Sequence, residues 1–171
     1  MKKYKKKLKI FPYYKRFPKV FEKGKNRISK AVKGVEIHHI GSTAVPGLGG
    51  KGIIDIMIGI KNWKEAKEII KKLESIGFKH LHPKETGRIF LSKHRKPTLD
   101  NFRIHIVIKG NKPYKDTLAL RDYLRKNRKE IKRLFKLKLK WLKETKGDRT
   151  KYFKLKEGYI KEILKRLTPK K

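Results

Sequence analysis

The sequence predicts an α/β domain whose C-terminal half is helical, and three observations support this prediction. The segment Ile53–Ile60 is almost entirely apolar, which is typical of a strand buried on both faces. The segment Phe102–Ile108 alternates apolar and polar residues, as a strand does when its two faces meet different surroundings. After Gly110–Pro113, apolar residues recur only at helical spacing.

The N-terminal part of the chain divides into a basic arm and the start of the domain. Residues 1–12 are interpreted as the arm and residues 13–168 as a single domain. Phe17-Pro18 opens a helix, because Pro is favoured in a first helical turn, and Gly34 ends it. We expect the next residues, 35–40, to form a short strand.

The middle of the chain continues the alternation of strands and helices. The glycine-rich segment 41–52 is expected to be a loop with one helical turn, and it leads into the strand Ile53–Ile60. Apolar residues at helical spacing then predict a helix from Trp63 to Ile76, which Gly77 ends. The remaining expected elements are strands over 78–81, 88–92 and 102–108, a basic turn over 93–99, and three helices separated in part by Gly147-Asp148.

The net charge of +36 is the extreme feature of the composition. A chain this basic repels itself and gains free energy from a polyanion, because each phosphate contact releases counterions. RNA or a ribonucleoprotein is therefore the expected partner. A proteome-wide lysine bias is the alternative interpretation, although thermophilic composition adds Glu along with Lys and this chain does not. An anionic membrane surface is a third option.

Several classes of protein are disfavoured. The chain has no cysteine, which excludes disulfides, thiolate metal sites and a cysteine nucleophile and fits a cytoplasmic protein. Its basic N-terminus lacks an apolar stretch of signal-peptide length behind it. No apolar run is long enough to predict a transmembrane helix.

The loop after the first expected strand has features of a phosphate site. Gly41 lets the backbone approach a phosphate closely, and free N–H groups in such a loop bind it. Ser42 and Thr43 add hydroxyl donors, and Lys51 adds a positive charge. An ordinary tight turn is the alternative interpretation of this segment.

Asp55 is the one charged residue within an apolar strand, where a carboxylate is costly without a partner. The partner could be a metal ion, a cation such as Arg103 or Lys51, or a backbone donor, so a structural ion pair explains this residue as well as a metal site does. Arg103 and His105 share one face of their strand, Arg88 precedes them, and Arg121 follows. If these strands are neighbours, the cations converge on one acid, as in a phosphate clamp.

The order of these motifs resembles the GrpB family. The run His39–Leu48, followed by Lys51 and Ile53–Ile56, is similar to that family's signature. Further matching motifs follow in the same order from about Tyr13 to Leu164: Arg88-Ile89-Phe90, Ile104-His105-Ile106-Val107, Leu120-Arg121-Asp122-Tyr123-Leu124-Arg125, and Lys156 before Tyr159-Ile160.

The resemblance implies a nucleotidyltransferase-like fold: a small mixed β-sheet flanked by helices, with a helical C-terminal half. In active members of that superfamily, Gly-Ser holds a triphosphate, here Gly41 and Ser42, and strand acids hold two metal ions. Asp55 would be the metal ligand and Mg²⁺ or Mn²⁺ the cofactor. This chain departs from the pattern, because Met57 occupies the second acid position and the later strand offers His105.

Two hypotheses of function remain open. In the first, which we favour, a catalytically reduced fold keeps a phosphate or nucleotide pocket and binds RNA or a ribonucleoprotein such as the ribosome. In the second, the chain is a metal-dependent nucleotidyltransferase or phosphotransferase with Asp55 and His105 as catalytic residues. Its substrate would be a nucleotide or a coenzyme A-related compound, because some GrpB proteins are fused to dephospho-coenzyme A kinase.

The residues expected to contact ligands fall into two groups. The phosphate- or nucleotide-binding residues are Gly41, Ser42, Thr43, Lys51, Arg88, Arg103, Arg121 and Lys156. The RNA-binding residues are the lysines of the arm, Lys2, Lys3, Lys5, Lys6, Lys7 and Lys9.

Overall fold

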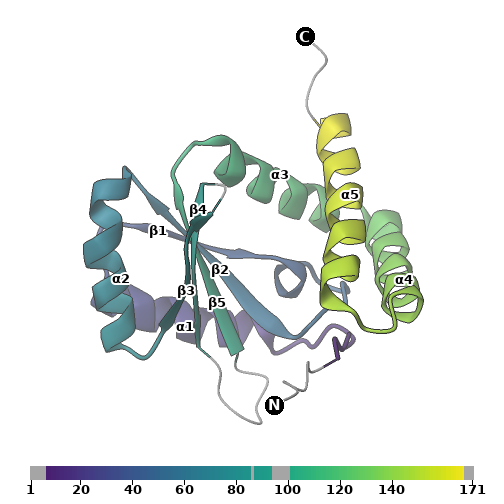
Figure 1. Cartoon of the computed structure of the whole chain (residues 1–171), viewed down its shortest axis with the longest axis horizontal. Helices are drawn as coiled ribbons and strands as arrows, with labels where there is room; N and C mark the ends of the chain where they lie inside the picture. The colour runs from purple at the N-terminus through teal and green to yellow at the C-terminus, as the bar shows by residue number, and fades with distance from the viewer. Residues whose placement is uncertain (1–6, 86, 94–100, 168–171) are drawn as a thin grey trace.

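The computed structural model describes residues 7–85, 87–93 and 101–167, which form one mixed sheet with helices on both faces (Figure 1). The helices are α1 (Phe17–Ala31), α2 (Ala66–Ser75), α3 (Lys112–Lys126), α4 (Arg128–Glu144) and α5 (Arg149–Leu167). The strands are β1 (Glu36–Ile40), β2 (Ile53–Ile60), β3 (Lys79–Glu85), β4 (Arg88–Lys93) and β5 (Asn101–Ile108). Two short 3₁₀ turns are η1 (Ser42–Ala44) and η2 (Trp63–Glu65).

The sheet has the strand order β1-β2-β5-β4-β3. Only β2 and β5 are parallel, and the other neighbours are antiparallel. The parallel register sets Asp55 opposite Arg103 and Met57 opposite His105. The predicted α/β class and the small mixed sheet flanked by helices are therefore confirmed, and the two strands that carry the candidate site are immediate neighbours.

The larger core lies between one face of the sheet and the helices α1 and α2. Ile54 and Ile56 of β2 and Ile104 and Ile106 of β5 are fully buried on this face. They pack against apolar residues that recur along one side of α1, such as Phe21. Period-two alternation sends the intervening residues of both strands to the opposite face. Met57 and Val107 are buried there with Tyr114 of α3.

The helices α3, α4 and α5 build a second core at one end of the sheet (Figure 1). Trp141 of α4 packs edge-on against Tyr152 and Tyr159 of α5. The predicted N-cap Asp148 is confirmed, because its Oδ1 accepts a hydrogen bond from the backbone N–H of Lys151 at 2.9 Å. The cavity described below lies where this helical core meets the sheet.

The end of the segment interpreted as a basic arm packs against the domain. Leu8 is buried in the second core, and its backbone N–H donates to the carbonyl of Gly147 at 3.3 Å. Phe11 and Gly50 exchange two backbone hydrogen bonds of 2.7 and 2.9 Å. Residues 8–11 therefore belong structurally to the domain that was expected to begin at residue 13.

The predicted elements differ from the structure mainly at their ends. The strand Ile53–Ile60 is confirmed with the predicted bounds, whereas the strand predicted over 78–81 extends to Glu85. The helix predicted from Trp63 begins as a 3₁₀ turn. The basic turn predicted over 93–99 lies, after Lys93, outside the described residues. Among the helices that the structure describes, none has the length and apolarity needed to cross a bilayer.

Candidate functional site

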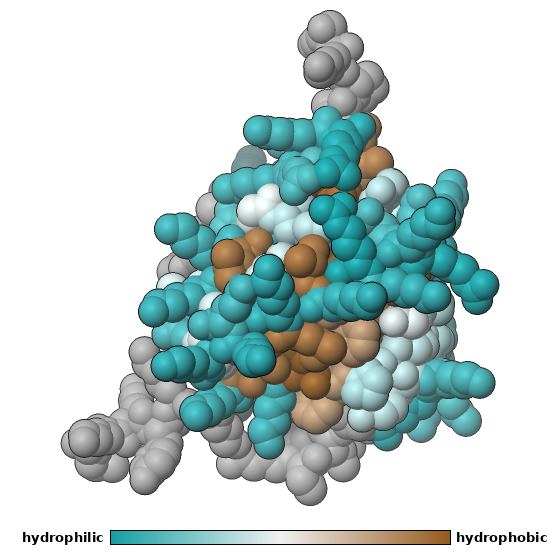
Figure 2. Space-filling view, turned by 90° about the vertical axis from the view of Figure 1, so that its right-hand side faces the viewer, coloured by the Kyte–Doolittle hydropathy of each residue, from teal (hydrophilic) through white to brown (hydrophobic). Residues whose placement is uncertain are grey.

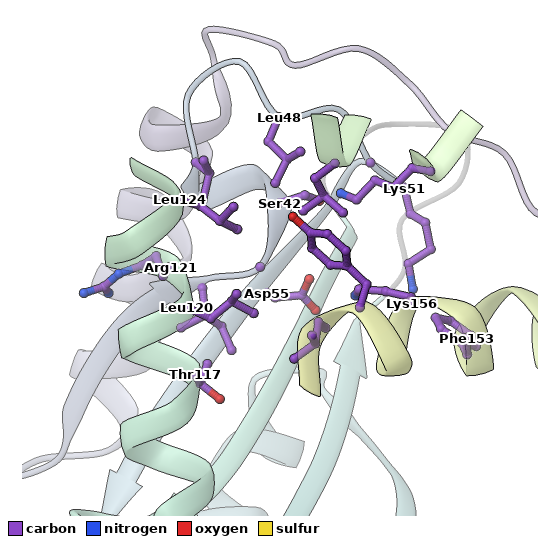
Figure 3. Close-up of a pocket in the computed structure, with 18 of the residues that line it drawn as sticks. Ser42, Leu48, Lys51, Asp55, Thr117, Leu120, Arg121, Leu124, Phe153 and Lys156 are labelled. Atoms are coloured by element: carbon purple, nitrogen blue, oxygen red, sulfur yellow. The ribbon is translucent and has the colours of Figure 1, made fainter. Parts of the chain in front are cut away.

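A cavity of about 300 Å³ lies between the sheet and the helices α3, α4 and α5 (Figure 3). All but one of the residues predicted to be catalytic or phosphate-binding line it. These are Gly41, Ser42, Lys51, Asp55, Arg88, Arg103, His105, Arg121 and Lys156. Residues from the first and last thirds of the chain thus meet in one place.

Thr43 is the exception, and its placement corrects the predicted set. Its side chain is buried in η1, where Oγ1 lies 3.0 Å from Nε2 of His39 and donates to the carbonyl of Ile53 at 3.2 Å. The hydroxyl predicted to hold phosphate is therefore committed to fixing the loop on the start of β2.

The conformation of Gly41 explains why glycine occupies the position between β1 and η1. Its φ of 73° and ψ of −169° lie in a region that essentially only glycine adopts, and holding a residue with a Cβ there costs about 1–3 kcal/mol. A Cβ there would also lie 2.5 Å from Oδ2 of Asp55. The loop backbone thus packs directly on the carboxylate and brings Ser42 to the cavity.

Asp55 and His105 form a hydrogen-bonded pair at the floor of the cavity. The distance from His105 Nε2 to Asp55 Oδ1 is 3.3 Å, and the two side chains are 14% and 20% exposed. Burial lowers the pKa of His105 more than the carboxylate raises it. Because Nδ1 is buried and has no hydrogen-bond partner among the described residues, protonating it would bury an unpaired N–H group. A neutral ring that donates from Nε2 fits this geometry.

Three cationic side chains surround this pair. Lys51 comes from the loop, Arg103 from β5 and Lys156 from α5, and Figure 3 shows Lys51 and Lys156 near Asp55. Burial would raise the pKa of Asp55, but His105, Lys51 and Arg103 together hold it below its usual value. Conversely, burial, Arg103 and Lys156 lower the pKa of Lys51 to about 7. The site therefore holds more positive charge than its carboxylate balances.

Lys138 of α4 is a site residue that the sequence analysis missed. It is 4% exposed, and its Nζ donates to the carbonyl of Gly49 at 2.7 Å. Burial and the neighbouring lysines lower its pKa well below the usual range. A signal was present, because position 138 continues the apolar stripe of Ile131 and Leu134, where a lysine is out of place.

Two predicted phosphate contacts are engaged within the protein. The guanidinium of Arg88 donates to Thr117 Oγ1 at 2.9 Å and to the carbonyl of Pro113 at 3.3 Å. That of Arg121 donates to Asp122 at 2.8 Å and to the carbonyl of His39 at 3.2 Å. In Figure 3 the Arg121 guanidinium points away from Asp55. Both arginines line the cavity while fastening α3 to the sheet.

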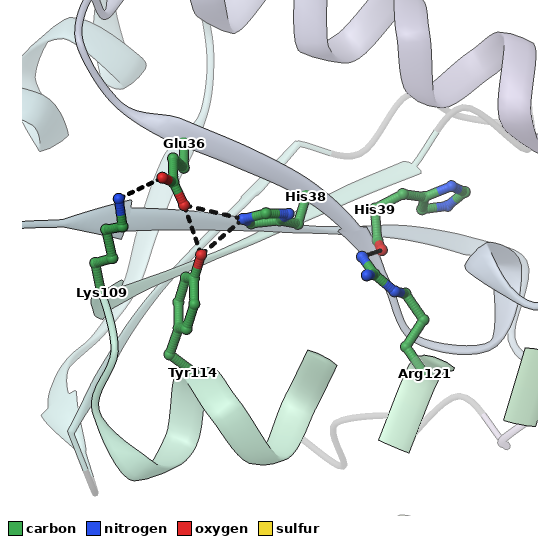
Figure 4. Close-up of polar contacts among 6 residues, drawn as sticks. All are labelled: Glu36, His38, His39, Lys109, Tyr114 and Arg121. Atoms are coloured by element: carbon green, nitrogen blue, oxygen red, sulfur yellow. Dashed lines mark hydrogen bonds and ion pairs between the residues drawn. The ribbon is translucent and has the colours of Figure 1, made fainter. Parts of the chain in front are cut away.

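A polar cluster beside the site fixes the start of α3 on β1 (Figure 4). Tyr114 donates to Glu36 Oε2 at 2.6 Å and lies 2.9 Å from Nε2 of His38. Lys109 pairs with the other oxygen of Glu36 at 2.5 Å. The hydrogen bonds from Lys109 and Tyr114 lower the pKa of Glu36 to about 2. This cluster holds the helix that forms one wall of the cavity.

The described residues do not fit the two-metal centre that the resemblance implied. Asp116 also lines the cavity, but its carboxylate pairs with Lys112 at 2.7 Å. Met57, at the position of the second acid, is fully buried against α3. Within residues 7–85, 87–93 and 101–167, no three His, Asp or Glu side chains gather to hold an ion. A single Mg²⁺ or Mn²⁺ on Asp55 stays a prediction.

The predicted RNA-binding lysines fall only partly within the structure. Lys7 and Lys9 are described and exposed, whereas Lys2, Lys3, Lys5 and Lys6 lie outside the described residues. Nothing in the structure brings Lys7 or Lys9 into the cavity lining.

The sheet and its flanking helices define a nucleotidyltransferase-type fold. The structure titled "Structural Basis for the Activity of a Cytoplasmic RNA Terminal U-transferase" superposes with a TM-score of 0.52 and 14% identity, over 74% of this chain and 41% of that one. At this identity the likeness is one of fold.

The chain belongs to the GrpB family, since that family's model, described as "GrpB protein", matches residues 7–166. The conserved protein GrpB from Enterococcus faecalis superposes with a TM-score of 0.80 at 26% identity, over 92% of this chain and 96% of that one. UPF0157 protein BH1888 from Halalkalibacterium halodurans is 28% identical over 159 residues, which are 92% of this chain and 80% of that protein.

Proposed function

We propose that the cavity binds a phosphate-bearing small molecule. The convergence of Lys51, Arg103 and Lys156 on one carboxylate carries this proposal. In the part of the chain that the structure describes, none of these three side chains donates a hydrogen bond to another residue, and the ammonium of Lys51 lies 4.6 Å from the centre of the Phe153 ring. All three residues are half-buried. Partly desolvated cations without sufficient counter-charge are costly, and an entering phosphate would supply both the charge and the acceptors.

A thermal-shift experiment tests this proposal. Inorganic phosphate, pyrophosphate and nucleoside mono-, di- and triphosphates are each added without metal, at an ionic strength held constant with KCl. We expect at least one to raise the Tm. Lys156→Met should abolish the rise, and Lys154→Met, which changes an exposed lysine of the same helix, should keep it. An equal rise in Tm when KCl replaces the phosphate compound, or an undiminished rise in Lys156→Met, would contradict the proposal.

We further propose that the outer surface of α4 and α5 binds RNA. Figure 2 shows this face, where hydrophilic side chains surround a smaller apolar area. The exposed lysines of the two helices are Lys129, Lys132, Lys136, Lys140, Lys143, Lys151, Lys154, Lys161 and Lys165. Such a surface attracts a phosphate backbone without reading sequence.

Fluorescence anisotropy with a labelled RNA at several KCl concentrations tests the second proposal. Affinity should fall steeply as salt rises. Changing Lys129, Lys136, Lys143 and Lys154 to Gln should weaken binding more than changing the exposed Lys23, Lys30, Lys67 and Lys71 of α1 and α2. Binding should survive Asp55→Ala. Equal losses in the two quadruple variants would show that net charge, and not this surface, governs binding.

A further inference from the structure

The cavity has two walls of different chemistry (Figure 3). Lys51 and Lys156 approach Asp55 from one side, whereas Leu48 of the loop and Leu120 and Leu124 of α3 face the cavity from the other. The remaining aliphatic residues of the lining are Ile10, Ile40, Val45, Leu134, Ile160 and Leu164. A phosphate alone would satisfy the cationic wall and leave the apolar wall facing water.

Among the described residues of the lining, the neutral side-chain groups left to read a nucleoside base are the hydroxyls of Ser42 and Tyr152. The lining contains neither Asn nor Gln among the described residues. The Thr117 hydroxyl already donates to the carbonyl of Pro113 at 2.7 Å and accepts from Arg88. The Tyr159 hydroxyl donates to Glu130. A base held here would lose several water contacts at its polar edge and would find only the free hydroxyls of Ser42 and Tyr152 among the described side chains to replace them.

We propose that the ligand is a short alkyl ester of phosphate or pyrophosphate, with its anionic head at Lys51 and Lys156 and its aliphatic part against Leu48, Leu120 and Leu124. This inference rests on the proposed phosphate site and adds the chemical nature of the attached group. The cavity of about 300 Å³ is at the small end of ligand sites, which suits a short chain.

Calorimetric titration with methyl, ethyl, butyl and hexyl phosphate tests this assignment, with inorganic phosphate and adenosine monophosphate for comparison. Burying each methylene should tighten binding by about fourfold until the chain fills the cavity. Butyl phosphate should therefore bind more tightly than adenosine monophosphate. Affinity that is independent of chain length, or adenosine monophosphate binding more than tenfold tighter than every alkyl phosphate, would overturn the inference and leave the phosphate site intact.

Two matched leucine variants separate the cavity wall from the molecular surface. Leu120→Ser should reduce the gain in affinity per methylene relative to the wild type. Leu155→Ser changes an exposed leucine of α5 that does not line the cavity, and it should keep the full gain. A gain lost equally in both variants would indicate adsorption on the surface and contradict the inference. Binding of no phosphate compound at all would instead overturn the proposed function itself.

Discussion

The lowered pKa of Lys51 shows that the folded site disfavours the charged form of this lysine. An unfolded lysine has a pKa of about 10.4, whereas burial first, and then Arg103 and Lys156, lower the pKa of Lys51 to about 7 in the folded chain. Between these values the unfolded chain binds more protons than the folded one. Folding stability must therefore rise with pH in this window. Lys138 and Lys156 act with the same sign, because burial lowers their pKa values too.

The Tm of the ligand-free protein should rise from pH 7 to pH 9.5, and it should rise less steeply in Lys51→Met. A bound phosphate would favour the protonated amine, so phosphate affinity should fall over the same range. Differential scanning calorimetry and titration at several pH values measure the two trends. Identical slopes in the wild type and Lys51→Met would show that Lys51 titrates at its ordinary pKa.

Asp55 allows the two hypotheses of function to be separated. Asp55→Asn keeps an acceptor for His105 and removes a negative charge from the cavity. If the cavity is a phosphate-binding site, the variant should bind inorganic phosphate about tenfold more tightly than the wild type, a difference of about 1.4 kcal/mol. It should also unfold more easily, by about 1–2 kcal/mol, because the surrounding cations lose their counter-charge.

Calorimetric titration and urea unfolding measure these two effects of Asp55→Asn. The opposite result would be weaker phosphate binding in the variant, together with wild-type binding that requires Mg²⁺ or Mn²⁺. That result would indicate that Asp55 holds a metal ion and would favour an enzyme.

At the scale of the element, the turn between β1 and η1 determines the geometry of the site. Gly41→Ala should cost about 3 kcal/mol of unfolding free energy, because the cost of a backbone conformation that only glycine adopts readily and the cost of a clash with Asp55 add. Gly34→Ala has nearly the same φ, 72°, and no atom within 4 Å of the new Cβ, so it should cost only about 1–2 kcal/mol. Urea unfolding of both variants measures the difference. Equal losses would mean that Asp55 moves aside freely.

The elements were predictable to the extent that their apolar patterns are local. Alternation along 102–108 correctly predicted that Arg103 and His105 share a face, and the apolar run 53–60 predicted β2. That β5 lies directly beside β2 was only a condition of the prediction, since pairing depends on contacts between distant segments. Lys138 could have been noticed as a lysine in an apolar stripe, but its partner, the backbone carbonyl of Gly49, could not have been predicted from sequence patterns.

At the scale of the whole molecule, the cavity lies between the sheet and the core formed by α3, α4 and α5. The core that joins the sheet to α1 and α2 lies on the other face of the sheet and contributes none of the described residues that line the cavity. Lys51 belongs to the loop between β1 and β2 and Lys156 to α5, so a bound phosphate would link this loop to the helical core. The cavity itself could not be predicted from the sequence, because it depends on how α5 lies against the loop.

Amide hydrogen exchange should detect this link. At a phosphate concentration of one hundred times its Kd, binding stabilises the closed protein by about 2.7 kcal/mol. Amides of α5 and of residues 45–52 that exchange only when the cavity opens should therefore exchange about 100-fold more slowly. Amides of α2, at the opposite end of the molecule in Figure 1, should change least when they exchange by local opening. Slowing that is confined to α2 would contradict a phosphate held between the loop and α5.

The packing of residues 8–11 has a practical consequence for shortening the chain. The lysine-rich start invites trimming at residue 13, because it looks like a dispensable tail. Ile10 lines the cavity, however, and Phe11 pairs with the glycine loop that Lys138 also holds. A protease cut or a deletion up to residue 12 would remove part of the cavity lining together with the N-terminal lysines. Loss of binding after such trimming would therefore not identify the lysines as the contact.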